Sequence, residues 1–101
     1  MAIFKLQLQK TYFAQGFFNV VVDYDRFVRS TEGPVTLRLG RTGEDVQGRI
    51  NRGANTNGTA RILAGPKLRD YFQKNFKPMG IVAVDLASMD LIVLDKPGGA
   101  Q

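Results

Sequence analysis

The sequence predicts a mainly β domain with about seven short strands and two short helices, folded as a β-barrel or a β-sandwich. Several segments alternate apolar and polar residues with a period of two, which is typical of half-buried strands. Clusters of glycine, proline and asparagine separate these segments at short intervals. The strands do not alternate regularly with helices, as they do in parallel sheets. We therefore expect one domain over residues 1–95 and a flexible, glycine-rich tail over residues 96–101.

The first elements are two strands and a short helix. Residues 3–9 alternate apolar and polar side chains, which indicates a half-buried strand. Residues 17–22 are rich in β-branched and aromatic side chains and predict a second, more buried strand. We expect residues 10–16 to be the loop between them. Residues 23–28 predict a short helix that begins at an aspartate cap.

The middle of the chain predicts a hairpin, a polar loop and a further strand. Residues 34–39 alternate cleanly, residues 40–43 form a glycine turn, and residues 44–50 pair back. Residues 51–59 contain three asparagines and two glycines, so we expect a loop there. Residues 60–63 predict the next short strand.

The last third predicts one amphipathic helix and a second hairpin. The helix covers residues 65–75 and has Pro66 near its start, where a missing N–H is tolerated. Its core-facing side chains are Leu68, Tyr71 and Phe72. Residues 80–86 and 91–94 predict the two strands of the hairpin.

The residues that are absent limit the chemistry. The chain contains no cysteine and no histidine, so thiolate or imidazole catalysis and the usual zinc sites are excluded. Its nine acids are scattered, and we interpret Asp23 with Asp25, and Glu44 with Asp45, as solvated pairs near a strand end and a turn. We therefore expect no enzymatic activity, no cofactor and no metal site.

The hydropathy pattern predicts a protein that is not associated with a membrane. No apolar run approaches the ~18 residues that a spanning helix needs, and polar residues interrupt any N-terminal signal-like stretch. The lack of cysteine is consistent with a reducing compartment. We expect a cytoplasmic location, associated with the nucleoid if the source is bacterial.

The charge is positive and unevenly distributed. The chain has 14 lysines and arginines against nine acids, a net charge of +5. Residues 49–77 hold seven of the basic side chains and a single acid, Asp70, whereas acids dominate from residue 78 onward. Such an asymmetry favours a polyanionic partner, and nucleic acid is the commonest one.

Two predicted loops contain the side chains that could contact nucleic acid. Arginine pairs bidentately with guanine or phosphate, and asparagine pairs bidentately with adenine. The first loop also offers Tyr12 and Phe13, which could stack on bases or support the loop. A plain hairpin loop, in which asparagine and glycine supply only backbone conformation, remains the alternative for the second. The candidate contacts are Lys10, Thr11, Tyr12, Gln15, Arg49, Asn51, Arg52, Asn55, Asn57, Thr59 and Arg61.

The order of these pieces resembles the B3-type DNA-binding domain of plant transcription factors and of the target-recognition domains of some bacterial restriction enzymes. The resemblance lies in residues 16–27, 33–40, 46–50 and 67–84. It implies a seven-stranded open pseudobarrel with two short helices, which grips the major groove of DNA with two arms. The arms would fall on residues 10–15, between the first two strands, and on residues 51–61, between the fourth and fifth.

We therefore expect a B3-like module that binds double-stranded DNA sequence-specifically and has no catalysis of its own. Two other classes stay open. One is an RNA- or single-strand-binding barrel that stacks bases on Tyr12 and Phe13. The other is a basic protein–protein interaction module from a bacterial defence or mobile-element locus. The sequence does not define an oligomeric state or a partner enzyme.

Overall fold

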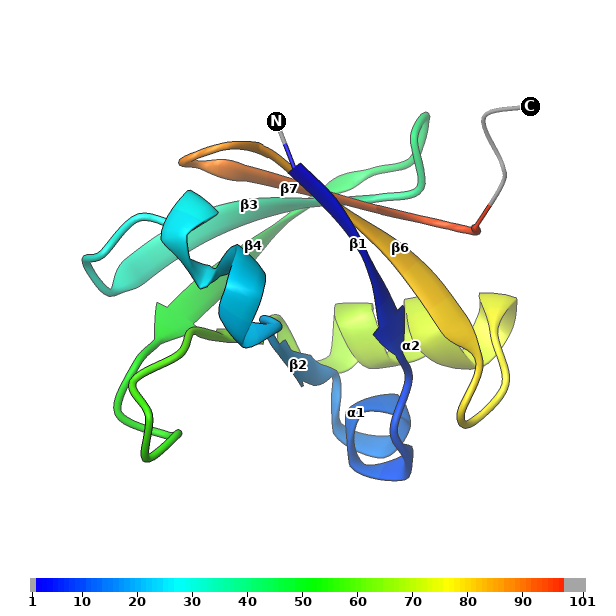
Figure 1. The fold of residues 1–101 in the computed structure, drawn as a ribbon. Helices are drawn as coiled ribbons and strands as arrows, with labels where there is room; N and C mark the ends of the chain where they lie inside the picture. Colours follow the sequence, from blue (N-terminus) through cyan, green and yellow to red (C-terminus); the bar gives the residue numbers. More distant parts are fainter. Residues whose placement is uncertain (1, 98–101) are drawn as a thin grey trace.

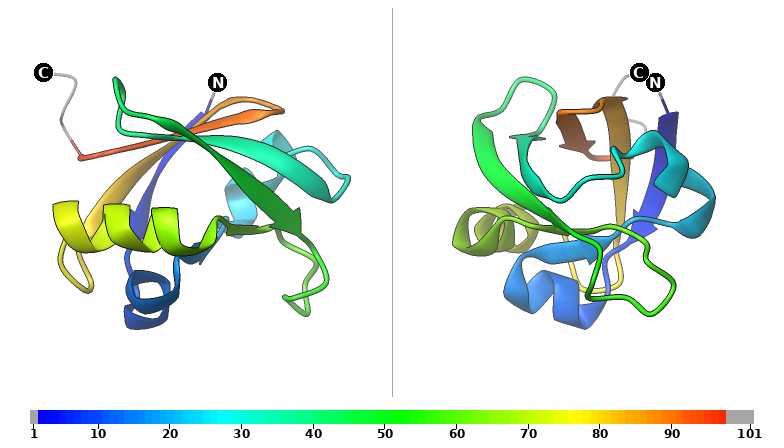
Figure 2. Two further views of the ribbon diagram at one scale, coloured as in Figure 1. Left: turned by 180° about the vertical axis from the view of Figure 1, so that it is seen from behind. Right: turned by 90° about the vertical axis from the view of Figure 1, so that its left-hand side faces the viewer.

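A computed structural model describes residues 2–97 and shows a curled sheet with short helices at its open side (Figures 1 and 2). In chain order the elements are β1 (Ala2–Gln7), α1 (Lys10–Gln15), β2 (Phe17–Asn19), the 3-10 helix η1 (Val22–Phe27), β3 (Gly33–Leu39), β4 (Asp45–Asn51), β5 (Arg61–Leu63), α2 (Gly65–Asn75), β6 (Ile81–Ser88) and β7 (Leu91–Asp95).

The seven strands form one sheet in the order β1-β6-β7-β3-β4-β5-β2. Every neighbouring pair is antiparallel except β3 and β7, which run parallel. Within the described residues no ladder joins the two edge strands, β1 and β2, so the curled sheet stays open. The predicted mainly β, seven-stranded open barrel is therefore confirmed.

The core lies on the concave side of the sheet. Strand β4 shows how the alternation works, because Val46, Gly48 and Ile50 are buried while Gln47 and Arg49 are exposed. Helix α2 adds Leu68 and Phe72, both fully buried in the same core. Burying large apolar side chains contributes about 1.5–3 kcal/mol each, and this burial holds the short strands together.

The segment predicted as the first loop is the helix α1, so that prediction is wrong. The helix ends at Gly16, whose φ of 79° is left-handed and whose N–H bonds to the Tyr12 carbonyl. The ring of Tyr12 is only 8% exposed and meets Phe17 edge-on, with 5.3 Å between ring centroids. Burial of Tyr12 therefore supplies the tertiary contact that stabilises so short a helix.

Most of the remaining predictions hold with small shifts, but the aspartate cap of the first short helix is wrong, because that helix begins at Val22 and its N-cap is Val21, without a side-chain cap. The helix expected at residues 23–28 is the 3-10 helix η1, and the strand expected at residues 17–22 ends at Asn19 because η1 follows. Helix α2 spans the predicted residues, and both predicted hairpins are present. The expected tail lies outside the described residues from position 98 onward.

Candidate nucleic-acid interface

Two connections project from the same side of the molecule. Helix α1, the first projection, joins β1 to β2, and residues 52–60, the second projection, join β4 to β5 (Figures 1 and 2). They flank the short β2–β5 ladder, because Phe17 pairs with Leu63 beside α1 and Asn19 pairs with Arg61 beside residues 52–60. The two segments predicted as arms are thus brought together around one patch of sheet.

The patch between the projections is the outer face of β2, β5 and β4. Phe18, Ile62 and Ile50 point into the core and are fully buried. Their neighbours along each strand therefore point outward, since side chains alternate across a sheet. Register places these outward side chains in two rows, one formed by Asn19, Arg61 and Asn51 and the other by Phe17, Leu63 and Arg49.

Arg61 is fixed at the centre of this outer face. Its Nε donates to Oδ1 of Asn19 at 3.0 Å, and its Nη2 donates to Oδ1 of Asn55 at 3.5 Å. The guanidinium carbon lies 4.5 Å from the centroid of the Phe17 ring, which is a cation–π distance. The Arg61 side chain is half-buried, and these three contacts orient its guanidinium.

Hydrogen bonds to asparagine side chains order the second projection. Oδ1 of Asn51 accepts from the backbone N–H groups of Gly53 and Ala54 at 2.8 and 3.1 Å. Oδ1 of Asn57 accepts from the backbone N–H and the hydroxyl of Thr59 at 3.2 and 2.8 Å. These bonds are Asx-type turns. They occupy the amide oxygens that bidentate adenine recognition by Asn51 and Asn57 would require.

Asn55 and Thr59 also help to hold the second projection in place. Nδ2 of Asn55 donates to Oδ1 of Asn19 and to the Thr59 carbonyl, each at 3.1 Å. Thr59 is buried, with 7% of its surface exposed. Asn55 therefore connects the second projection to β2, and Thr59 lies beneath the loop rather than on its surface.

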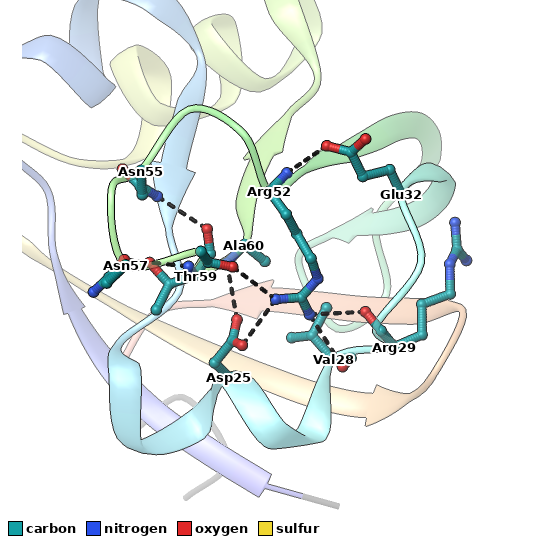
Figure 3. Close-up of polar contacts among 10 residues, drawn as sticks. Asp25, Val28, Arg29, Glu32, Arg52, Asn55, Asn57, Thr59 and Ala60 are labelled. Atoms are coloured by element: carbon teal, nitrogen blue, oxygen red, sulfur yellow. Dashed lines mark hydrogen bonds and ion pairs between the residues drawn. The ribbon is translucent and has the colours of Figure 1, made fainter.

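Arg52 turns inward and holds the second projection to the body of the domain (Figure 3). Its Nη1 lies 2.8 Å from Oδ2 of Asp25 and donates to the Gly58 carbonyl at 3.1 Å. Its Nη2 donates to the carbonyls of Val28 and Arg29 at 3.3 and 2.8 Å. With only 17% of this side chain exposed, Arg52 is unsuited to the phosphate or guanine contact that the sequence suggested.

Two acids that the sequence did not single out also hold the second projection to the domain. Oδ1 of Asp25 accepts from the backbone N–H of Ala60 at 2.8 Å, and Oε2 of Glu32 accepts from the Arg52 backbone N–H at 2.7 Å. The expectation that Asp25 is a solvated strand-end acid is wrong, because only 23% of its side chain is exposed and both carboxylate oxygens accept hydrogen bonds. No local sequence signal marks a pair separated by 27 positions.

The first projection presents a polar surface over an apolar base. Lys10, Thr11 and Gln15 are exposed, as a DNA-contacting role requires, whereas Tyr12 is in the core and is unavailable for stacking. Phe13 is partly buried against the core, and its carbonyl accepts a hydrogen bond from Nε2 of Gln73 at 3.1 Å. Helix α2 thereby braces the first projection.

Ion pairing leaves an excess of unpaired positive charge. Seven of the nine acids form ion pairs with six of the 14 basic side chains. One of these pairs joins Arg38 to Asp45 at 2.8 Å on the surface, and the hydrogen bond from Arg38 holds the pKa of Asp45 below its ordinary value. Within residues 2–97 the basic side chains outside ion pairs are Lys5, Lys10, Arg26, Arg49, Arg61, Lys74, Lys77 and Lys96.

Arg49 lies beside a shallow groove on the outer face. The groove has a volume of about 510 Å³ and is lined by Gly33, Pro34, Gln47, Gly48, Arg49 and Leu63. Arg49 itself is exposed and makes no side-chain hydrogen bond to the described residues. It is therefore free to meet an anionic ligand.

Two other functional features are absent from the part of the chain that the structure describes. No group of three or more histidine, cysteine, aspartate or glutamate side chains there is arranged to hold a metal ion. No helix there has the length and apolar character needed to cross a membrane.

Comparisons of the chain with protein-family models, with curated proteins and with solved structures found no match.

Proposed function

We propose that this protein is a double-stranded DNA-binding module, without catalysis of its own, that places its two projections at the major groove. The observation that carries the proposal is that two cations outside ion pairs lie on the outer face of β4 and β5, and a third lies on the first projection, which leads into β2. Lys10 begins the first projection, Arg49 lies on β4, and Arg61 lies between the projections. Such a face attracts the phosphate backbone and offers donors to the bases.

The dimensions of the face support a duplex as the ligand. A helix with its side chains is about 10–12 Å across, and the major groove is ~12 Å wide. Helix α1 has six residues, and its exposed side chains Lys10, Thr11 and Gln15 can enter that groove. Strands β4 and β2 lie on either side of β5, so Arg49 is about 10 Å from β2.

The burial of the aromatic side chains favours a duplex over a single strand. Single-strand binders stack bases on exposed aromatic rings. Within residues 2–97 every phenylalanine and tyrosine is buried or partly buried, including Tyr12 and Phe13. The second projection is also held rigid by Arg52 and the asparagines, which suits a ligand of fixed shape.

Fluorescence anisotropy with labelled oligonucleotides tests the proposal. We expect duplex DNA to bind more tightly than either of its separated strands. Two to four phosphate contacts would make the logarithm of the affinity fall with the logarithm of salt concentration with a slope of about −2 to −4. Binding that prefers single strands, or that ignores salt, would contradict the proposal.

Charge reversal locates the interface on the molecule. Lys10→Glu and Arg49→Glu should each weaken duplex binding at low salt and reduce the salt slope by about 1. Lys96→Glu is the matched control, because Lys96 is also exposed and unpaired but follows β7, which β3 separates from β4 in the sheet. If Lys96→Glu weakened binding as much as the other two, the proposed face would be wrong.

The third class, a basic protein–protein interaction module, predicts a different outcome. Duplex DNA would then bind no better than any other polyanion, such as heparin. An acidic protein partner would be retained by the immobilised chain after nuclease treatment.

A further inference from the structure

We infer that Arg61 is the specificity-determining residue of the DNA-binding face and reads one guanine, and that Asn19 and Phe17 are positioning residues for its guanidinium. The inference rests on the proposed function and adds to it a base and a residue that recognises that base. Asn19 enters here as a functional residue because its amide oxygen accepts from Nε of Arg61 at 3.0 Å.

The hydrogen bonds of Arg61 use only one edge of its guanidinium. Nε donates to Asn19 and Nη2 donates to Asn55, and these two atoms form the side edge of the planar group. The end edge, formed by Nη1 and the second N–H of Nη2, makes no hydrogen bond to the described residues. Two parallel N–H groups on that edge match the O6 and N7 acceptors of guanine.

The ring of Phe17 fixes the plane of the guanidinium. Arg61 lies 4.5 Å above this ring, and Phe17 in turn packs edge-on against Tyr12 of the first projection. Asn55 brings the second projection to the same guanidinium, so both projections help to orient Arg61. The rotamer entropy that an arginine usually loses on binding is therefore largely lost already in the free protein.

The position of Arg61 favours a base over a phosphate. It lies on β5, between strands β4 and β2 and between the two projections. Lys10 on the first projection and Arg49 on β4 are exposed, whereas Arg61 is half-buried and hydrogen-bonded to two asparagines. Exposed cations suit the phosphate backbone, and a guanidinium of fixed orientation suits a base edge.

The test begins with the unaltered protein. A selection from random duplexes identifies its preferred site, and each guanine of that site is then replaced in turn by 7-deazaguanine, which lacks the N7 acceptor. We expect one guanine at which the replacement weakens binding by at least about fivefold. A preferred site without guanine, or a site at which no 7-deazaguanine matters, would overturn the inference while leaving duplex binding intact.

Variants then assign that guanine to Arg61. Arg61→Lys keeps the positive charge but loses the planar fork, so it should lower affinity for the preferred site by roughly 5- to 150-fold. The same variant should bind the matching 7-deazaguanine site no worse than the unmodified site. Arg38→Lys is the control, since Arg38 is an arginine of β3 that pairs with Asp45 at the start of β4, whereas Arg61 pairs with Asn51 at the other end of that strand.

The variant Asn19→Ala distinguishes a role of Asn19 in positioning Arg61 from a role in folding. It should reduce discrimination at the same guanine, while affinity for random duplexes and the unfolding midpoint change little. Equal losses on all sequences for Arg61→Lys would identify Arg61 as a phosphate contact and overturn the inference. No duplex binding by the unaltered protein would instead refute the proposed function, and the inference with it.

Discussion

The carboxylate of Asp25 binds Arg52 and thereby joins the second projection to η1. Oδ2 of Asp25 lies 2.8 Å from Nη1 of Arg52, at the start of the projection. Oδ1 of the same carboxylate accepts from the backbone N–H of Ala60, at its end, also at 2.8 Å. One side chain on η1 therefore binds both ends of a loop rich in asparagine and glycine, and this explains how such a sequence is ordered.

Removing Arg52 should destabilise the domain. In Arg52→Ala the Asp25 carboxylate loses its cation, and three carbonyl oxygens lose a donor, which we expect to cost about 2–4 kcal/mol of unfolding free energy. Urea unfolding measures the change, and Arg49→Ala is the control because Arg49 is exposed and unbonded. Equal unfolding midpoints for the two variants would show that the contacts of Arg52 do not stabilise the domain.

This expectation reverses the one that the sequence gives. An arginine in a polar loop predicts a variant with impaired DNA binding and unchanged stability. The inward contacts of Arg52 predict that Arg52→Ala loses stability, and that it loses binding only through disorder of residues 52–60. Amide hydrogen exchange should accordingly accelerate at those residues in the variant.

A pair of glycines tests how α1 is held. Gly16 and Gly58 both have left-handed φ angles, 79° and 76°. A Cβ at Gly16 would lie 2.2 Å from the Gly65 carbonyl oxygen, whereas at Gly58 it would meet no atom within 4 Å. Gly58→Ala should therefore cost only the backbone strain, ~1 kcal/mol, and Gly16→Ala about 2–4 kcal/mol. Similar costs measured by urea unfolding would show that α1 does not pack closely on α2.

Phe72 tests the core beneath the sheet. Its ring is fully buried on α2, so Phe72→Ala should lower the unfolding free energy by about 3–5 kcal/mol. Lys74→Ala, two residues along the same helix at an exposed position, should change it by less than ~0.5 kcal/mol. Thermal melting of both variants by circular dichroism provides the comparison, and a stable Phe72→Ala protein would contradict the described core.

The free energy of unfolding should fall at alkaline pH, partly because Tyr71 loses its proton. Burial, with a smaller effect of Asp95, raises the pKa of Tyr71 from 10.0 to about 12. The folded state therefore retains this proton where the unfolded state loses it, so the stabilisation is complete below pH 10 and is lost between pH 10 and 12. Tyr71→Phe should show a shallower decline in urea midpoint over that range. Parallel declines in the two proteins would exclude a role for Tyr71.

Much of the fold follows from local patterns. Helix α2 was predictable because Pro66 marks its first turn and Leu68 and Phe72 share one face. The β3–β4 hairpin was predictable because both strands alternate on either side of a glycine turn. The parallel pairing of β3 with β7 was not, because it joins segments about 55 positions apart, for which no period or turn residue carries a signal.

The sequence predicted which segments form the candidate site, but it predicted the roles of the single residues less well. Composition identified residues 10–16 and 49–61, and the structure brings these segments to the same side of the sheet (Figure 1). It did not distinguish an arginine that faces a ligand from one that faces a carboxylate, as Arg61 and Arg52 illustrate. Asn19 was missed because a single polar residue in an apolar run resembles an ordinary strand interruption.

We propose that duplex DNA binds the outer face of β2, β5 and β4 between the two projections. Titration of the isotopically labelled protein with a duplex, followed by amide chemical shifts, tests this most directly. We predict that the largest shifts fall on α1, β2, residues 52–60 and β5, including Arg61. Shifts confined to β1, β6 and β7, or an unchanged spectrum at a saturating concentration of duplex, would contradict the account.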